Sequence, residues 1–421
     1  MFSKKTKKVF LGTVDIAGQI GSYQQGYESN GYRVFSFVND RSKSFKTKYN
    51  FVYFSLYPNW LLTNNRLAIL RKIYTLIIVR PIYWILMLWA ILSCDIFHFM
   101  WFLPKENVFI LWILRKMKKR IIISFVGSDI RWYPLWVAEF DERSLTYPDF
   151  DVLMKLAKDL QVTLDKQLRN CRIFEKYADV IISVPEQSQL LLRPYFNFYL
   201  PLDLDKIKFK LAKNKRIKVA IGVTGAAKNS ETVLDAVQRL QKRRLNDFDV
   251  ILLINMQHED ILKELSESDI FIYTPYGCGT GRFGMEAIAS GTLCMCGYDE
   301  KWYNIPSGLP VVPITESDFL LKLESYIDNH EARESLILAG KSWIEKYADP
   351  KWIVKDILKK LENPDKKYDY IPAYFRDKAK FDSEGNPPDA ADQCNKWTTY
   401  VKDCDWYKKH VPLGTRDGLI F

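Results

Sequence analysis

The chain has 421 residues, of which 48% are hydrophobic and 26% are charged, and these are globular values that allow two domains with large buried cores. Its seven cysteines form no Cys-x-x-Cys pair and its four histidines show no ligand spacing, so neither a disulfide framework nor a zinc site is indicated. The first apolar run, residues 9–11, is too short for a signal peptide, and a reducing cytoplasm is the expected compartment.

The formal net charge is +11, and the basic residues gather at positions 4–8, 115–120, 206–218 and 242–244. Nucleic acid is one possible partner for so basic a chain, but no nucleic-acid-binding module is visible, so no nucleic acid is expected. An anionic membrane surface or anionic substrates explain the charge better. A soluble surface with excess lysine remains an alternative.

The first half of the chain predicts alternating strands and helices. A strand at 8–14 leads into a glycine-bearing turn at 12–21, which contains Gly18, and then into a helix that ends near residue 29. Runs of β-branched and aromatic residues predict the other strands, at 31–37, 51–55, 96–99, 121–125 and 180–184. Strands separated by helical stretches indicate a parallel sheet with crossover helices, in a domain of residues 1–202.

Residues 73–92 form an apolar stretch that Arg80 and Pro81 interrupt. The run after the proline, at 82–92, is too short to span a bilayer. Either it is a core helix beneath the first sheet, or it is an interfacial helix whose Trp84 and Trp89 dip into a membrane surface. The sequence leaves both interpretations open.

Residues 203–216 read as a linker, after which alternation resumes in a second domain, 217–345. Its strands are expected at 217–223, 249–254, 270–273 and 293–296, with helices at 231–243, 259–267 and 286–290 between them. A helix within 346–364 is expected to cross back to the first domain. The tail, 365–421, either wraps the body through its aromatic residues or is partly disordered. Two such domains place their ligand in the cleft between them, at the carboxyl ends of strands.

The segment 273–291 carries the strongest chemical signal. It follows an apolar strand, brings together Gly279, Gly281, Arg282 and Gly284, and opens a helix whose first turn carries Glu286. Glycines let a backbone approach a ligand closely, and a helix N-terminus attracts anions. Arg282 can fork onto phosphate oxygens, and Glu286 can accept hydrogen bonds from the hydroxyls of a ribose.

Three interpretations of this segment compete. Residues 279–284 match the dinucleotide pattern G-x-G-x-x-G, and Asp299 follows at the distance of a ribose-binding acid. However, a carboxylate so soon after the third glycine would face the pyrophosphate. A nucleotide-sugar site is therefore favoured over an NAD site, and a glycine loop that only turns the chain is the third possibility.

Several segments occur in the order seen in glycosyltransferases of the GT-B fold, and they look most like the retaining family 4 type. They are residues 95–99, 125–131, 228–230, 264–269 and 279–291, and the resemblance covers roughly residues 8–362. It implies an α/β fold in which two Rossmann-like domains face a central cleft, with a C-terminal helical segment and tail.

The activity implied by this resemblance is transfer of a sugar from a nucleotide diphosphate donor to an acceptor hydroxyl, with retention. No metal and no cofactor besides the donor are expected. The acceptor would be a glycan or a lipid-linked molecule, as in cell-envelope polysaccharide synthesis. The enzyme would be cytoplasmic or peripheral at the inner face of the membrane. The sequence indicates no oligomeric state.

The resemblance also assigns roles to single residues. Glu286 matches the second glutamate of the family's E-x7-E motif, which holds the nucleotide ribose, but Cys278 stands where the first glutamate is expected. Lys228 matches the lysine that contacts the diphosphate, and Arg282 could compensate for the missing arginine upstream of it. Gly18 belongs to the N-terminal glycine loop that approaches donor phosphates and acceptor. Val126 replaces the family's N-domain histidine.

His98 and Asp129 are further catalytic candidates. His98 ends a strand, where it could contact sugar or acceptor, although a histidine on an apolar strand is more often a hydrogen-bonded core residue. Asp129 could contact a ligand or pair with Arg131 at a turn. Cys278 and Val126 motivate an alternative function, a catalytically degenerate GT-B protein that only binds nucleotide sugars. An NAD-dependent oxidoreductase is a less favoured alternative.

Overall fold

The structure is a computed structural model of the chain. It describes residues 7–39, 48–58, 60–61, 67–100, 108–127, 129–144, 147, 153, 155, 163–197, 200–211, 216–222, 230–244, 247–276, 279–300, 306–363 and 390–410. The chain divides into two compact units, each made of several stretches. The first comprises Met1–Val126, Ile173–Ile182 and Pro350–Lys366, and the second comprises Gly127–Arg172, Ser183–Asp349 and Lys367–Phe421.

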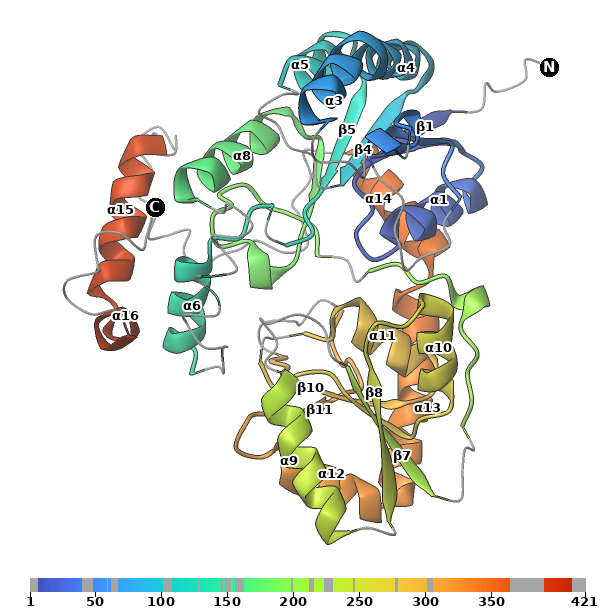
Figure 1. The fold of residues 1–421 in the computed structure, drawn as a ribbon, viewed down its shortest axis with the longest axis vertical. Coiled ribbons are helices and arrows are strands. Elements are labelled where there is room, and N and C mark those ends of the chain that lie inside the picture. The colour runs from blue at the N-terminus through green and yellow to red at the C-terminus, as the bar shows by residue number, and fades with distance from the viewer. Residues whose placement is uncertain are drawn as a thin grey trace. The chain divides into compact units, whose positions relative to one another are not determined.

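A six-stranded parallel sheet forms the centre of the first unit (Figure 1). Its order is β3-β2-β1-β4-β5-β6, which is the strand order of the Rossmann fold. The strands are β1 (Lys8–Thr13), β2 (Arg33–Val38), β3 (Phe51–Val52), β4 (Ile96–Met100), β5 (Arg120–Ser124) and β6 (Val180–Ile182). The central strands β1, β4 and β5 are buried almost along their whole length, as expected for continuous apolar runs covered on both faces.

The helices that cover this sheet are α1 (Gln19–Ser29), α3 (Ala68–Tyr74), α4 (Arg80–Ser93), α5 (Val108–Lys116) and α14 (Pro350–Glu362), with a short 3-10 helix η1 (Tyr53–Leu56). Helix α14 comes from the far end of the chain and packs on α1. The contact requires Gly26, because a Cβ there would lie 2.4 Å from the carbonyl oxygen of Pro350. The C-terminal helix expected within 346–364 thus belongs to the first unit.

Arg80 and Pro81 do not interrupt the helix that carries them. Helix α3, a π-helical turn η3 (Thr75–Val79) and α4 form one continuous helix, Ala68–Ser93. Pro81 lies inside this helix, where it has no N–H to donate, and the wider π turn directly precedes it. The apolar helix is therefore longer than the sequence pattern predicts.

The second unit contains a five-stranded parallel sheet of order β11-β10-β9-β7-β8. Its strands are β7 (Ile217–Gly222), β8 (Phe248–Leu253), β9 (Ile270–Ile272), β10 (Leu293–Cys296) and β11 (Val312–Pro313). The helices are α9 (Ser230–Arg243), α10 (His258–Ser266), α11 (Gly281–Ala289), α12 (Phe319–Asp328) and α13 (His330–Tyr347). Two apolar clusters form the core, one centred on Phe271, Ile288 and Trp343, the other on Ile221, Val237 and Leu323.

The second unit also includes segments outside this sheet. They are α6 (Tyr133–Glu142), most of α8 (Leu164–Tyr177), the 3-10 helices η5 (Pro185–Gln187) and η6 (Leu204–Lys206), and two tail helices, α15 (Ala390–Asp403) and α16 (Asp405–His410). Helix α15 packs on α6, and the tail buries Trp397 and Tyr407. The expected linker at 203–216 therefore lies within this unit, and residues 127–172 and 183–202 are grouped with it rather than with the first sheet.

Candidate functional site

The order of strands in the second sheet marks a position for a ligand. From β7 the chain turns outward to β8 on one side and then to β9 on the other, so the order reverses between β7 and β9. Parallel α/β sheets bind ligands at the carboxyl ends of their strands, at such a reversal. Two loops start there: residues 223–229, which contain Lys228 and lie outside the described residues, and the glycine-rich loop that leads from β9 into α11.

Two glycines fix how α11 begins and packs. Gly281 adopts a φ of +54°, and a Cβ at this position would lie 2.7 Å from the hydroxyl of Tyr273. At Gly284 a Cβ would lie 3.1 Å from the sulfur of Cys294, so this glycine lets α11 approach β10 closely. Gly279 is half-buried in the loop before the helix, and Cys278 lies outside the described residues. The backbone and packing constraints on Gly281 and Gly284 explain two glycines of the G-x-G-x-x-G pattern without requiring a bound dinucleotide.

Behind this loop, Glu286 is the centre of a buried charged cluster. Its Oε1 accepts a hydrogen bond of 2.7 Å from Arg282 Nε and one of 2.8 Å from His258 Nε2. Only 3% of Glu286 and 9% of Arg282 are exposed, so these charges depend on one another for stabilisation. Among the described residues none donates a hydrogen bond to the second oxygen, Oε2. One carboxylate oxygen is thus anchored by protein, while the other remains available to a ligand hydroxyl.

The electrostatics of this cluster favour an anionic ligand. Arg282 is the second residue of α11, so a cation sits at the positive end of the helix dipole, where it is ordinarily unfavourable. Glu286, one turn later, offsets part of that charge. A phosphate at the helix N-terminus would offset the rest, because it accepts from backbone N–H groups and from a guanidinium together.

His258 was not among the residues singled out from the sequence. It is the first residue of α10, which starts after β8, and α10 packs on α11. Its position in the sequence could have indicated a role at the site, because it is a polar residue that opens a helix at the carboxyl edge of a predicted parallel sheet. The pattern of histidine spacing gave no such signal, since its partner Glu286 is 28 residues away in the chain.

In the first unit, Gly18 lies in the loop between β1 and α1, with a φ of 71° at the start of the helix. The loop is held by Asp15, whose Oδ1 accepts from the backbone N–H of Ile20 at 3.0 Å and whose Oδ2 accepts from the Tyr49 hydroxyl at 2.6 Å. At Gly12, a Cβ would lie 2.2 Å from the carbonyl oxygen of Phe37. The glycines here serve the turn and the contact between β1 and β2, and the approach of Gly18 to donor phosphates stays a prediction.

His98 has the environment of a core histidine. It is fully buried on β4, with Nδ1 3.1 Å from the Tyr27 hydroxyl and Nε2 2.7 Å from the Ser124 hydroxyl. Burial lowers its pKa to about 3, so the ring is neutral at pH 7. Both ring nitrogens have protein partners, which is the arrangement of a hydrogen-bonded core histidine, and a contact of His98 with sugar or acceptor stays a prediction.

Asp129 forms a buried turn after β5. Its Oδ1 accepts from the backbone N–H of Gly127 at 2.9 Å, and its carbonyl accepts from the side-chain amide of Asn170 at 3.3 Å. The Arg131 guanidinium lies 4.0 Å from Glu186 and stacks on the ring of Trp136. The carboxylate of Asp129 thus shapes its own loop, and nothing in this geometry directs it to a reacting atom.

The described residues contain no group of three His, Cys, Asp or Glu side chains positioned to hold a metal ion. One further buried acid stands apart from the cluster around Glu286. Glu139 on α6 accepts from Arg143 Nε and from Gln189 Nε2, each at 3.0 Å, and burial raises its pKa to about 7.

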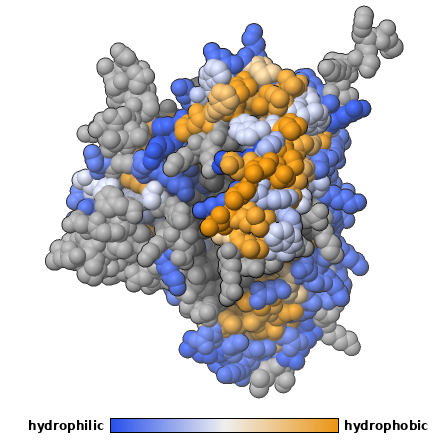
Figure 2. Space-filling model, turned by 45° about the horizontal axis from the view of Figure 1, so that its top comes forward, coloured by the Kyte–Doolittle hydropathy of each residue, from blue (hydrophilic) through white to orange (hydrophobic). Residues whose placement is uncertain are grey.

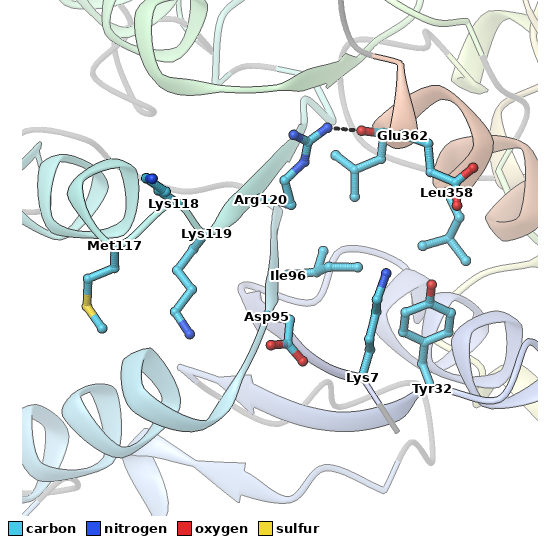
Figure 3. Close-up of a pocket in the computed structure, with 11 residues that line it drawn as sticks. Lys7, Tyr32, Asp95, Ile96, Met117, Lys118, Lys119, Arg120, Leu358 and Glu362 are labelled. Atoms are coloured by element: carbon cyan, nitrogen blue, oxygen red, sulfur yellow. Dashed lines mark hydrogen bonds between the residues drawn. The ribbon is translucent and has the colours of Figure 1, made fainter. Parts of the chain in front are cut away.

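A cavity of about 490 Å³ lies at the amino edge of the first sheet (Figure 3). It is lined by residues that precede or open strands, among them Lys7, Tyr32, Asp95 and Arg120, and by the end of α14. The Arg120 guanidinium donates to the carbonyl of Leu361. Because ligands of such sheets bind at the carboxyl edge, this cavity is not a candidate for the nucleotide.

No protein-family model matches the chain, and no curated protein matches its sequence. Solved structures do match its fold. The Anabaena protein Alr3699/HepE in complex with UDP aligns with a TM-score of 0.50 at 12% identity, over 85% of this chain and 100% of that one. Sucrose-phosphate synthase from Thermosynechococcus elongatus aligns with a TM-score of 0.48 at 12% identity, over 85% and 99% of the two chains. A putative UDP-N-acetylglucosamine 2-epimerase from Listeria monocytogenes aligns with a TM-score of 0.48 at 12% identity, over 87% of this chain and 100% of that one.

At this identity the likeness concerns the fold alone, and membership of family 4 stays a prediction. The strand order in the two parallel sheets agrees with the GT-B fold, since each sheet is Rossmann-like and has a point where the strand order reverses. The chain is an α/β protein with the GT-B fold.

Proposed function

We propose that the chain is a glycosyltransferase that moves a sugar from a nucleotide diphosphate donor to an acceptor hydroxyl. The observation that carries the proposal is the cluster at the start of α11. There a guanidinium at a helix N-terminus adjoins a carboxylate with one oxygen anchored and the other unengaged by described residues. A diphosphate next to a ribose requires these two recognition elements, an anion site and a hydroxyl acceptor.

The residues would divide the work as follows. Glu286 Oε2 accepts from a ribose hydroxyl, while Arg282 and His258 fix the carboxylate through Oε1. Arg282 holds Glu286 through Nε, and its guanidinium brings a positive charge to the N-terminus of α11, where the diphosphate would bind. As the bond between sugar and diphosphate breaks, negative charge grows on the leaving group. Arg282, the N-terminus of α11 and Lys228 stabilise that charge, which is catalysis by electrostatics.

Retention of configuration, independence from metal and cofactors, and an acceptor in glycan or cell-envelope polysaccharide synthesis belong to the same proposal. They are supported by the resemblance of the motifs. The prediction that Lys228 contacts the diphosphate has the same support, together with its position in the segment after β7.

Isothermal titration calorimetry with UDP, GDP, CMP and NAD tests the binding half of the proposal. We expect one nucleoside diphosphate to bind, and Glu286→Ala to weaken it. Glu264→Ala is the matched control, because Glu264 also forms a carboxylate–cation pair in this unit, with Lys218 Nζ at 2.5 Å, but at the opposite, amino edge of the sheet. Preferential binding of NAD would overturn the nucleotide-sugar assignment.

Transfer or hydrolysis of the nucleotide sugar that matches the bound base tests the catalytic half. Release of nucleoside diphosphate by the wild type, lost in Arg282→Ala, supports a transferase. The alternative function, a catalytically degenerate GT-B protein, is motivated by Cys278 and predicts tight binding with no turnover of any nucleotide sugar.

A further inference from the structure

Exposed apolar side chains are concentrated on one part of the first unit. Of the nineteen large hydrophobic side chains that are exposed in the described part of the chain, fifteen lie between Trp60 and Met117. Singly scattered apolar residues are normal on a protein surface, but a contiguous apolar area marks an interaction site. Figure 2 shows such an area on the face that is brought forward, where α3, α4 and α5 lie in Figure 1.

We call this surface the apolar face: the exposed side of the continuous helix Ala68–Ser93 together with the exposed side of α5. Right-handed crossovers place α4 and α5 on the same side of the sheet, because both connect strands in the same direction across it. The most exposed members are Ile69 at 76%, Ile85 at 66% and Leu92 at 65%.

The helix Ala68–Ser93 is long and apolar enough to cross a membrane, with 26 residues, and it is the one such helix among the described residues. Its packing gives a different orientation. Val79, Met87, Ala90 and Ile91 form a buried stripe, and Trp89 packs edge-on against Phe35 of β2, with ring centroids 4.8 Å apart. A helix that lies on its own sheet along one side cannot be surrounded by lipid. It can only present its opposite side to a bilayer.

The helices that carry the apolar face have charged residues of one sign only. Residues 68–94 contain Arg71, Lys72 and Arg80 and no acidic residue, and residues 108–120 contain five basic residues and no acidic one. Lys116 Nζ lies 5.9 Å from the centre of the Trp112 ring, so charge and aromatic surface are adjacent. Helix α5 leads directly into the cavity at the amino edge of the sheet, which Lys118 and Lys119 line.

That cavity adds to the positive rim. Its lining contains Lys7, Lys118, Lys119 and Arg120 against two acids, Asp95 and Glu362, so cations exceed anions by two (Figure 3). Lys119 Nζ donates to the carbonyl of Cys94 at 2.6 Å, which fixes one of these cations at the ends of α4 and α5. The rim is therefore electropositive at the end where both helices meet the sheet edge.

We propose that the apolar face docks on an anionic phospholipid bilayer, with α3–α4 and α5 lying in the plane of the interface. Amphipathic surfaces with tryptophan on the apolar side and lysine or arginine around it bind this way, buried to about 5–10 Å. Charge complementarity selects the occupant. Two copies of this face would bring like charges together, which disfavours a dimer, whereas anionic headgroups neutralise the rim. The inference is independent of the nucleotide site.

Co-sedimentation of the full chain with vesicles tests the proposal. We expect binding to vesicles that contain phosphatidylglycerol, weaker binding to pure phosphatidylcholine, and release by high salt. The double variant Ile85→Glu with Leu88→Glu should lower the bound fraction by at least about tenfold, since a charge replaces each apolar anchor. Its matched control is Leu321→Glu with Leu338→Glu, which alters two exposed leucines of the second unit.

The basic rim has its own pair of variants. Lys116→Gln with Lys118→Gln should lower affinity for anionic vesicles by about fivefold for each lysine removed. The control is Lys242→Gln with Arg243→Gln, at the corresponding C-terminal end of α9. All changed positions are exposed or half-exposed, and an unchanged circular dichroism spectrum and unfolding midpoint would show that each variant is folded. Quenching of tryptophan fluorescence by brominated lipid, reduced in Trp84→Phe with Trp112→Phe, supports the same contact without charge changes.

Three outcomes would overturn the proposal. The first is equal recovery of the wild type in the supernatant at all lipid compositions and salt concentrations. The second is a dimer in lipid-free solution, seen by light scattering and dissociated by Ile85→Glu, which would make the face an interface between copies. The third is vesicle binding that resists high salt and alkaline carbonate, which would indicate a spanning helix instead of docking.

Discussion

Each of the two units has a histidine beside its sheet, and the two histidines have opposite surroundings: His98 lies in the middle of β4, and His258 opens α10 after the end of β8. In the first unit, His98 is enclosed by Tyr27 and Ser124, two neutral partners that occupy both ring nitrogens. In the second, His258 Nε2 donates to a charged carboxylate, Glu286, which also accepts from Arg282. The first arrangement is closed upon itself, and the second leaves a carboxylate oxygen without a partner among the described residues.

The difference shows what separates a structural polar group from a group that we propose to bind a ligand. Burial alone does not, because His98 and Glu286 are both almost fully inaccessible. The two sites differ in whether every hydrogen-bonding atom of the central side chain has a partner among the described residues. Neutral groups that hydrogen-bond to each other stabilise a core. A charged cluster with an unused acceptor at a helix N-terminus is instead stabilised when it binds an anion and a hydroxyl group.

The largest expected effect concerns the closed arrangement. His98→Ala should lower the free energy of unfolding by about 3–5 kcal/mol, because it creates a buried cavity and leaves the Tyr27 and Ser124 hydroxyls unpaired. Chemical denaturation measures it. Nucleoside diphosphate affinity of the folded variant should be unchanged, and a large loss of affinity with unchanged stability would reverse the roles assigned to the two histidines.

The same residue predicts a pH dependence. Because the folded protein lowers the pKa of His98 to about 3, the unfolded chain binds a proton below pH 6.5 that the folded chain does not bind. The contribution of His98 to stability is therefore complete above pH 6.5 and is lost as the pH falls toward 3. Stability of the wild type should fall more steeply over this range than that of His98→Gln, and parallel curves would contradict the neutral, buried ring.

The next effect concerns the charged cluster around Glu286. Arg282→Ala should lower turnover about 100-fold, the loss typical of removing one group that stabilises charge in the transition state. Lys228→Ala should act in the same direction. Both should alter turnover more than nucleoside affinity, since the charges face the leaving diphosphate, and steady-state kinetics with the preferred donor separates the two. Wild-type turnover in either variant would make that residue an ordinary surface or structural charge.

Glu286→Ala should weaken binding of the preferred nucleoside diphosphate by about 1.5–3 kcal/mol, the range for hydrogen bonds to charged groups. Part of the loss is indirect, because Arg282 and His258 lose their shared acceptor. Calorimetry measures the affinity, with Glu264→Ala as the control pair at the other edge of the sheet. If the two variants bind equally well, the ribose assignment fails.

Both sheets were predictable from the sequence, because runs such as Val9–Leu11 and Ile121–Ile123 are buried on both faces and bounded by turn residues. The loop before α11 was predictable for a similar reason, because its glycines stand between an apolar run and a helical segment; the anion site at this loop stays a prediction. His258 could not be found in this way, because nothing local in the sequence reports that α10 and α11 pack side by side. The helix through Pro81 was also hidden, since a proline inside an apolar run ordinarily indicates a break, and the π turn that precedes this one has no sequence pattern of its own.

The smallest expected effect concerns His258, the residue that the sequence did not reveal, and it tests directly whether this histidine differs in role from His98. His258→Ala should weaken nucleoside diphosphate binding by about 0.5–1.5 kcal/mol, the worth of one hydrogen bond, since Arg282 still holds Glu286 Oε1. His258→Gln should restore most of the loss, because its amide can donate to the same oxygen. A purely structural role would instead lower stability in both variants and leave affinity equal in both. Calorimetry and denaturation on the three proteins distinguish a residue that positions Glu286 from a second core histidine like His98.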